Sequence, residues 1–87
     1  MHADKKKVTR LINTAKGQLE GILRMIEEDR YCVDISTQLM ASIAILNKAN
    51  REVLAAHMRA CVKDALTDED SAEDKIEELV MLMEKMS

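Results

Sequence analysis

The sequence predicts an all-α protein, and three observations support this fold class. It contains no proline and only two glycines, so few residues interrupt a helix. Tyr31 is the only aromatic residue, and the other apolar side chains are compatible with helices. In three stretches the apolar residues recur at steps of three and four, which is the period of an amphipathic helix.

The chain of 87 residues is short enough to form one domain, expected over residues 1–87. A chain of this size buries a modest core, so an obligate oligomer is a real possibility. We see no signal peptide and no apolar run of membrane-spanning length, and we expect a cytoplasmic protein without membrane contact. Thiols stay reduced there, which favours ligands, redox centres or buried apolar cysteines over a structural disulfide.

The first helix is predicted over residues 4–29, with Asp4 as its N-cap. Gly17 and Gly21 lie on one side of it, where we expect a second backbone to approach closely. Polar residues 27–31 interrupt the apolar pattern and predict a short turn.

The second helix is predicted over residues 32–64, which contain neither glycine nor proline, with a length of ~50 Å. At 100° per residue, one face gathers apolar and metal-ligating side chains within ~60° of Leu39. We call this face the ligand seam, and it holds Cys32, Leu39, Ile43, Leu46, Leu54, His57 and Cys61.

The third helix is predicted over residues 71–86, after a linker at 67–71 whose last residue, Ser71, is a capping type. Met81, Met83 and Met86 are interpreted as packing residues rather than thioether ligands of copper. This last third is strongly acidic, whereas the first two thirds are mildly basic. The charge distribution therefore leaves room for a nucleic-acid-binding face on the first two helices.

His57 and Cys61 are four residues apart, which places both side chains on one face of a helix. Cys32 shares that face, but in a straight helix it lies ~37 Å from His57. The three side chains meet only if two chains pair antiparallel about a two-fold axis near Ile45 and Leu46. Two thiolates and one imidazole suit trigonal Cu(I), which the ligand count favours over Zn(II).

Other interpretations of these residues stay open. The cysteines can be inert buried side chains, or they can form a thiol redox switch between chains. A cysteine nucleophile with a histidine base is not favoured because no orienting group accompanies it, so no enzyme is predicted. His2 is interpreted as a disordered terminal residue rather than a fourth ligand.

Several motifs resemble copper-sensing repressors of the CsoR/RcnR type. They are Arg30-Tyr31-Cys32-Val33-Asp34-Ile35 with Gln38, Leu46-Asn47-Lys48-Ala49-Asn50, His57-x-x-x-Cys61-Val62 and Gly17-Gln18-Leu19-Glu20-Gly21-Ile22. The resemblance covers roughly residues 8–80. It implies a three-helix protomer, an antiparallel four-helix-bundle dimer and a tetramer built as a dimer of dimers.

The resemblance also implies a site and a function. Cu(I) is held by Cys32 of one chain with His57 and Cys61 of the other, with Tyr31 and Glu77 in contact with the ligands. The form without Cu(I) binds operator DNA, and Cu(I) releases it to derepress copper-resistance genes; no small-molecule substrate is implied. A thiol redox or persulfide switch that uses Cys32 and Cys61 is the alternative. The candidate DNA-binding cations are Lys5, Lys6, Lys7, Arg10, Lys16, Lys48 and Arg51.

The sequence departs from other branches of this family. Nickel and cobalt sensors have histidine where Cys61 stands, formaldehyde sensors use an N-terminal proline, and persulfide sensors lack the histidine that His57 provides. The basic cluster of the first helix matches only in part, because Arg10 is displaced by one position and Lys16 stands where arginine is common.

Overall fold

The computed structural model describes residues 1–67 and 72–86, which form three helices and no strand. Helix α1 spans Lys5–Glu27, α2 spans Cys32–Thr67 and α3 spans Ala72–Met86. The all-α prediction is confirmed, although α2 continues beyond its predicted end near residue 64. Most of the linker predicted at 67–71, including Ser71, lies outside the described residues.

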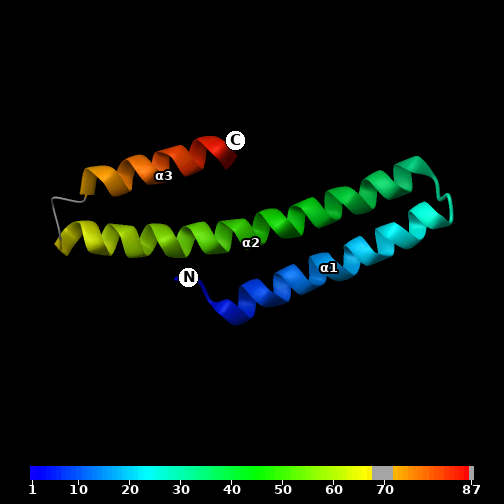
Figure 1. Cartoon of the computed structure of the whole chain (residues 1–87), viewed down its shortest axis with the longest axis horizontal. Helices are drawn as coiled ribbons and strands as arrows, with labels where there is room; N and C mark the ends of the chain where they lie inside the picture. The colour runs from blue at the N-terminus through cyan, green and yellow to red at the C-terminus, as the bar shows by residue number, and fades with distance from the viewer. Residues whose placement is uncertain (68–71, 87) are drawn as a thin grey trace.

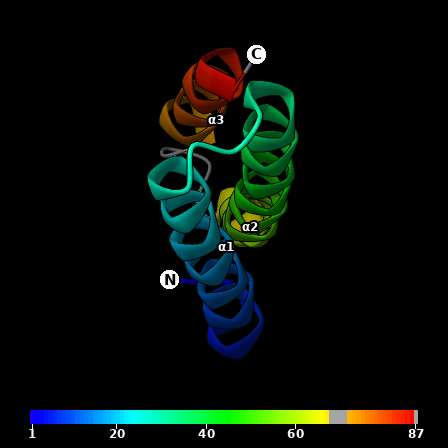
Figure 2. The same cartoon turned by 90° about the vertical axis from the view of Figure 1, so that its right-hand side faces the viewer.

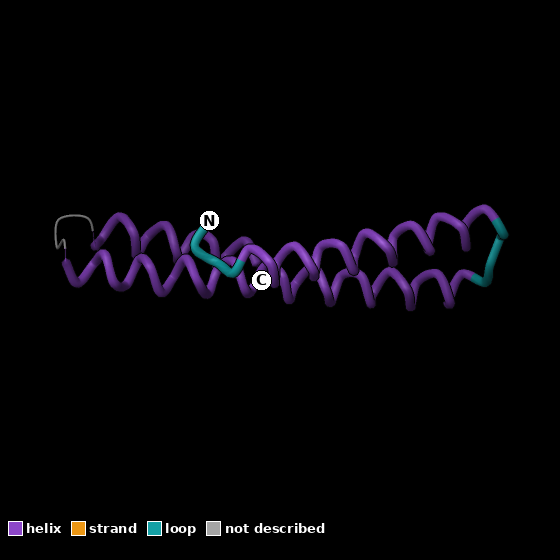
Figure 3. The backbone as a smooth tube through the Cα atoms, turned by 90° about the horizontal axis from the view of Figure 1, so that it is seen from below, coloured by secondary structure: helices purple, strands orange, loops and turns teal. Residues whose placement is uncertain are grey.

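Helix α2 is the central element, and both other helices pack against it (Figures 1 and 2). Helices α1 and α2 form a long antiparallel hairpin, and α3 turns back along the C-terminal part of α2. The result is an elongated, thin molecule of 57 × 26 × 13 Å. Residue 1 and the end of α3 lie at a similar level along the long axis (Figure 3). Met1 and His2 line one cavity together with residues of α2 and α3, so the start of the chain lies near the α2–α3 contact.

Both ends of α1 are defined by local hydrogen bonds. The Asp4 side chain accepts hydrogen bonds from the backbone N–H groups of Lys6 and Lys7 at 3.0 and 3.3 Å, which confirms it as the N-cap. At the other end, Asp29 adopts a left-handed φ of 51°. The Arg30 N–H donates to the Met25 carbonyl at 3.0 Å, the long-range bond of a Schellman motif. Asp29 therefore ends α1.

Small residues form the contact between α1 and α2. Ser42, Ala49 and Ala56 are buried and recur every seven residues along α2. They face α1, whose buried residues Ala15 and Ile22 are also seven apart. Short side chains let two antiparallel helices approach closely, and the seven-residue repeat keeps them in contact along the hairpin.

One buried hydrogen bond fixes the register of this hairpin. The Ser42 hydroxyl, 2% exposed, donates to the Gln18 side-chain carbonyl at 3.0 Å. A buried hydroxyl without a partner is costly, so sliding one helix along the other by a turn is disfavoured. Near the start of α1, the Lys7 ammonium lies 2.9 Å from the Glu52 carboxylate of α2 and joins the same two helices.

The glycines of α1 do not provide the expected close approach within this chain. A Cβ built on Gly17 meets no atom within 4 Å among the described residues, and one on Gly21 meets only the Arg24 guanidinium of the same helix at 3.7 Å. The close helix contact is made by the alanines and the serine instead. The sequence contained this pattern as small residues spaced by seven.

Much of the apolar surface of α2 and α3 remains exposed in the single chain. Leu39, Ile43 and Leu46, the apolar part of the ligand seam, are 42–55% exposed. On α3, Met83 and Met86 line a groove of about 310 Å³ against α2, and Met81, which is not among its lining residues, is exposed like them. Exposed apolar faces of this extent are typical of surfaces that contact another protein. None of the described helices is both long and apolar enough to cross a membrane.

Candidate metal centre

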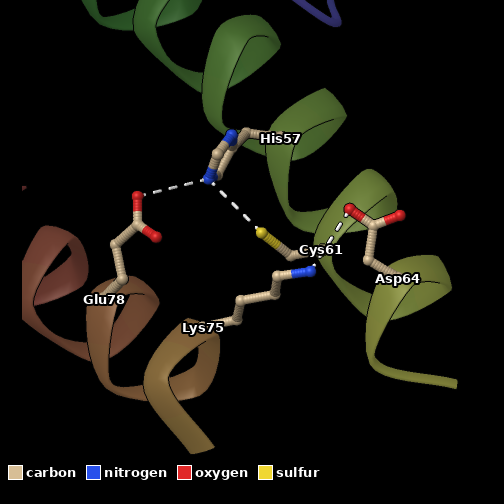
Figure 4. A network of polar contacts seen from close by, with 5 residues as sticks. All are labelled: His57, Cys61, Asp64, Lys75 and Glu78. Carbon is tan, nitrogen blue, oxygen red and sulfur yellow. Dashed lines mark hydrogen bonds and ion pairs between the residues drawn. The ribbon is translucent and has the colours of Figure 1, made fainter. Parts of the chain in front are cut away.

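His57 and Cys61 lie one turn apart near the C-terminal end of α2, and their side chains meet (Figure 4). The Cys61 Sγ lies 3.4 Å from the His57 Nε2. Metal bonds of about 2.3 Å to sulfur and 2.0 Å to nitrogen place two ligand atoms ~3.5 Å apart. The pair therefore has the spacing that one metal ion requires, without a change in the backbone.

Helix α3 completes the surroundings of this pair (Figure 4). The Glu78 Oε1 lies 3.5 Å from the His57 Nε2, and the Lys75 ammonium lies 3.4 Å from the Asp64 carboxylate. Cys61 is buried at 7% exposure, whereas the His57 side chain is 34% exposed. The thiol is thus shielded, and the imidazole stays accessible from one side.

Cys32 is placed at the opposite end of the same helix. It is the first residue of α2 and is exposed. Since α2 is continuous from Cys32 to Thr67, ~37 Å separates Cys32 from His57. Accordingly, no three His, Cys, Asp or Glu side chains in the described part of the chain converge as a metal site. Within one chain, the structure therefore places the predicted ligand Cys32 and the predicted pair His57 and Cys61 at opposite ends of α2.

His2 lies beside His57, close to the predicted metal centre. Its ring centroid lies 5.9 Å from that of His57, with a tilt of 48° between the ring planes. Met1, His2, His57 and Glu78 are among the residues that line a cavity of about 240 Å³. The structure thus places His2 beside His57, and its part as a disordered residue or a further ligand stays a prediction. The only signal in the sequence was the Asp4 cap, which fixes the point where residues 1–3 leave α1.

The two residues expected beside the ligands have different positions. Tyr31 is 69% exposed next to Cys32, far from His57 of the same chain. Glu77 is exposed, and the carboxylate that reaches His57 is that of its neighbour Glu78. Neighbouring residues on a helix point 100° apart, so the rotation of α3 against α2 decides which of the two glutamates reaches His57. The roles of Tyr31 and Glu77 stay predictions.

The predicted DNA-binding cations fall into two groups. Three of them line an open depression on the first turns of α1, together with threonine and asparagine side chains. The full lining of this depression, called here the basic groove, is Lys5, Lys6, Thr9, Arg10, Asn13 and Thr14. Lys7 is instead paired with Glu52, while Lys16, Lys48 and Arg51 are exposed on the helices.

A family model of metal-sensitive transcriptional repressors matches residues 4–85, nearly the whole chain. The chain belongs to this family. The Cys32, His57 and Cys61 positions and the basic groove all lie within the matched residues.

Two relatives illustrate the similarity within the metal-sensitive repressor family. The copper-sensing transcriptional repressor CsoR of Mycobacterium ulcerans (strain Agy99) is 44% identical over 66 residues, which cover 75% of this chain and 56% of the relative. CsoR of Bacillus subtilis (strain 168) is 36% identical over 84 residues, covering 97% and 82%. The chain spans only 56–65% of the length of the mycobacterial CsoR relatives that it matches.

Solved structures of the family share this fold. The crystal structure of the copper-sensing repressor CsoR with Cu(I) from Geobacillus thermodenitrificans NG80-2 has a TM-score of 0.84 and 28% identity, and the match covers 99% of this chain and 92% of that one. The nickel-responsive transcriptional regulator InrS has a TM-score of 0.85 at 23% identity, with coverage of 100% and 97%. The second likeness concerns the fold alone, so the metal must be inferred from the donor atoms.

Proposed function

We propose that the protein is a Cu(I)-responsive transcriptional repressor, which binds operator DNA without Cu(I) and releases it when Cu(I) binds. Derepression of copper-resistance genes follows. The observation that carries the proposal is the pair Cys61 Sγ and His57 Nε2 at 3.4 Å, with Cys32 on the same face at the far end of an unbroken helix. We expect the protein in the cytoplasm, where these thiols stay reduced.

The complete site forms between two chains. When two α2 helices lie antiparallel, Cys32 of one chain is level with His57 and Cys61 of the other. The exposed residues Leu39, Ile43 and Leu46 lie between the two sites and provide the apolar contact. A two-fold axis near Leu46 generates two identical sites, so burial of the seam and completion of the ligand sets are the same event. Association of two such dimers into a tetramer follows from the resemblance.

The donor set favours Cu(I). Two thiolates and one imidazole are soft ligands, and a three-ligand set suits trigonal Cu(I), whereas structural Zn(II) sites use four protein ligands. The relatives named above are described as copper-sensing, which agrees with this choice. When bound, Cu(I) supplies a bond between the chains at each site, and its binding displaces the thiol protons.

The Glu78 carboxylate orients the His57 imidazole. Glu78 lies 3.5 Å from the His57 Nε2, so it can accept a hydrogen bond from the ring when that nitrogen carries a proton. If Nε2 becomes a metal ligand, Glu78 loses this contact. The α2–α3 arrangement is thereby sensitive to whether the site is occupied, and such outer contacts tune metal affinity.

The basic groove on α1 and the exposed cations of α2 form the DNA-contacting surface. Threonine and asparagine beside Lys5, Lys6 and Arg10 supply further hydrogen-bond donors for phosphate oxygens. Among the described helices, none stands out from the body as a recognition helix, because α1 and α3 both pack along α2. We therefore infer that backbone contacts and DNA shape dominate the recognition.

A thiol switch is the second candidate function, and the exposure of Cys32 favours it over a purely structural role. In the antiparallel pair, oxidation by a peroxide or a polysulfide joins the two sulfurs of Cys32 and the partner's Cys61 in a disulfide or polysulfide link. Two thiol hydrogens are removed, and the oxidant is reduced. Burial of Cys61 at 7% exposure limits access of the oxidant, which makes metal sensing the first choice.

Anaerobic titration with Cu(I) under a competing chelator, with operator binding followed in parallel, tests the proposal. We expect one Cu(I) per chain and weaker DNA binding by the loaded protein, with a coupling of about 5- to 150-fold. Unchanged DNA affinity at full Cu(I) occupancy would contradict the regulatory function. DNA release by polysulfide with a mass-spectrometric Cys32–Cys61 link, and none by Cu(I), would favour the thiol switch.

A further inference from the structure

Residues 1–4 connect two parts of the molecule that the proposed function requires to communicate. At one end of this segment, the His2 ring contacts the His57 ring at 5.9 Å between centroids. At the other end, Asp4 caps α1 by accepting hydrogen bonds from Lys6 and Lys7. Only Ala3 and Asp4 stand between His2 and the first residue of α1.

The capped turn carries part of the basic groove. Lys5 and Lys6 line the groove, and Lys7 pairs with Glu52 on α2 at 2.9 Å. The direction of the Lys5 and Lys6 side chains therefore depends on how the first turn of α1 is held. Two contacts hold this start of the chain on α2, one at Glu52 and one at His57.

The His57 ring contacts both His2 and the groups beside the predicted metal centre. Its Nε2 is directed toward Cys61 and Glu78 (Figure 4), while the His2 ring makes a tilted contact with the imidazole. Met1 and His2 also line the cavity of about 240 Å³ beside His57 and Glu78. A rotation of the imidazole, or entry of a partner side chain into this cavity, would therefore alter the contact between the His2 and His57 rings.

We propose that His2 is a positioning residue that couples the metal centre to the basic groove through residues 3 and 4. This inference rests on the proposed function, because it assigns a structural link between the two sites of that function. In the form without metal, the ring contact holds the start of α1 in its capped position, which favours phosphate binding. When the site is occupied, the contact is lost and the DNA-bound arrangement is disfavoured, and the same coupling acts in reverse.

Two substitutions in the full chain test the role of the ring. His2→Ala removes the contact, whereas His2→Phe keeps an aromatic ring that has no nitrogen ligand. We expect His2→Ala to reduce the effect of Cu(I) on operator affinity by about 3- to 10-fold, the scale of one aromatic contact. His2→Phe should retain the coupling and the Cu(I) affinity of the unmodified protein. In the absence of DNA, His2→Ala should bind Cu(I) about 3- to 10-fold more tightly, because metal binding then breaks no ring contact.

The other outcomes distinguish the inference from the function on which it rests. If the unmodified protein fails to release DNA with Cu(I), the proposed function fails. If that protein responds and His2→Ala responds equally, the positioning role is overturned. Equal loss of Cu(I) affinity in both variants, with one nitrogen fewer around copper by X-ray absorption, would make His2 a direct ligand and would also overturn it. Circular dichroism checks that both variants keep their helix content.

Discussion

The two ends of α2 carry the same residue type in opposite surroundings. At the C-terminal end, Cys61 is buried, contacts His57 at 3.4 Å and is covered by α3. At the N-terminal end, Cys32 is exposed next to the turn after α1. The comparison teaches that one chain brings two of the predicted ligands together and leaves the third exposed at the other end of the helix. Burial alone would identify Cys61 as the functional thiol and overlook Cys32.

The largest expected effect comes from removing either sulfur. We expect Cys32→Ser and Cys61→Ser to lower the Cu(I) affinity to a similar extent, by at least about 100-fold, since even outer contacts to a metal site are worth 10- to 100-fold. Competition with a Cu(I) chelator measures this. A Cys32→Ser protein with nearly normal affinity would show that Cys61 and His57 bind the metal without a partner chain.

Substitution in the apolar part of the ligand seam, between the two ends of α2, is expected to have the second-largest effect. Ile43→Glu should weaken the dimer more than about 100-fold, because it places an unpaired carboxylate in the expected contact. Met40→Glu is the matched control, since Met40 is equally exposed on α2 but lies outside the seam. Sedimentation equilibrium measures the dimer dissociation constant, and titration measures the Cu(I) affinity. We expect both quantities to change in Ile43→Glu and neither to change in Met40→Glu. An Ile43→Glu dimer of normal stability would move the interface elsewhere.

Removal of the Glu78 carboxylate, near the end of α2 that carries Cys61, should have an intermediate effect. Glu78→Gln removes the charge that lies 3.5 Å from His57, and we expect Cu(I) affinity or the DNA response to change by about 10-fold. Glu77→Gln, one residue earlier on α3, serves as the control in the same titrations. A strong effect at Glu77 with none at Glu78 would mean that α3 turns when the two chains pair.

The smallest effect is expected for the ion pair at the start of α3. Lys75→Met breaks the contact with Asp64, and the loss in free energy of unfolding should stay below ~1 kcal/mol because Asp64 is solvent-exposed. Urea unfolding followed by circular dichroism measures it. A loss of several kcal/mol would indicate that this pair, rather than apolar packing, holds α3 on α2.

Local periodicity was enough to predict the three helices, the Asp4 cap and the shared face of His57 and Cys61. These features depend on neighbours within one or two turns. The helical period also placed Leu39 and Ile43 on the ligand seam. Their exposure in the single chain agrees with a surface that contacts a partner chain. That interface itself stays a prediction.

The features that the sequence did not reveal depend on how separate elements meet. Whether Glu77 or Glu78 reaches His57 is decided by the orientation of α3, which no local pattern determines. The contact of His2 with His57 depends on the path of three residues ahead of a capped helix. The small-residue repeat of Ser42, Ala49 and Ala56 was present in the sequence. The larger apolar residues of the ligand seam on the same helix gave a stronger periodic signal.

Mixing the two cysteine variants tests most directly whether each site is shared between chains. Dimers that pair a Cys32→Ser chain with a Cys61→Ser chain contain one intact site, whereas neither variant alone contains any. After exchange at equal concentrations, random pairing predicts that about one quarter of the high-affinity Cu(I) capacity returns. Recovery at that level would support the two-chain site. A mixture that exchanges subunits yet binds no Cu(I) tightly would contradict it.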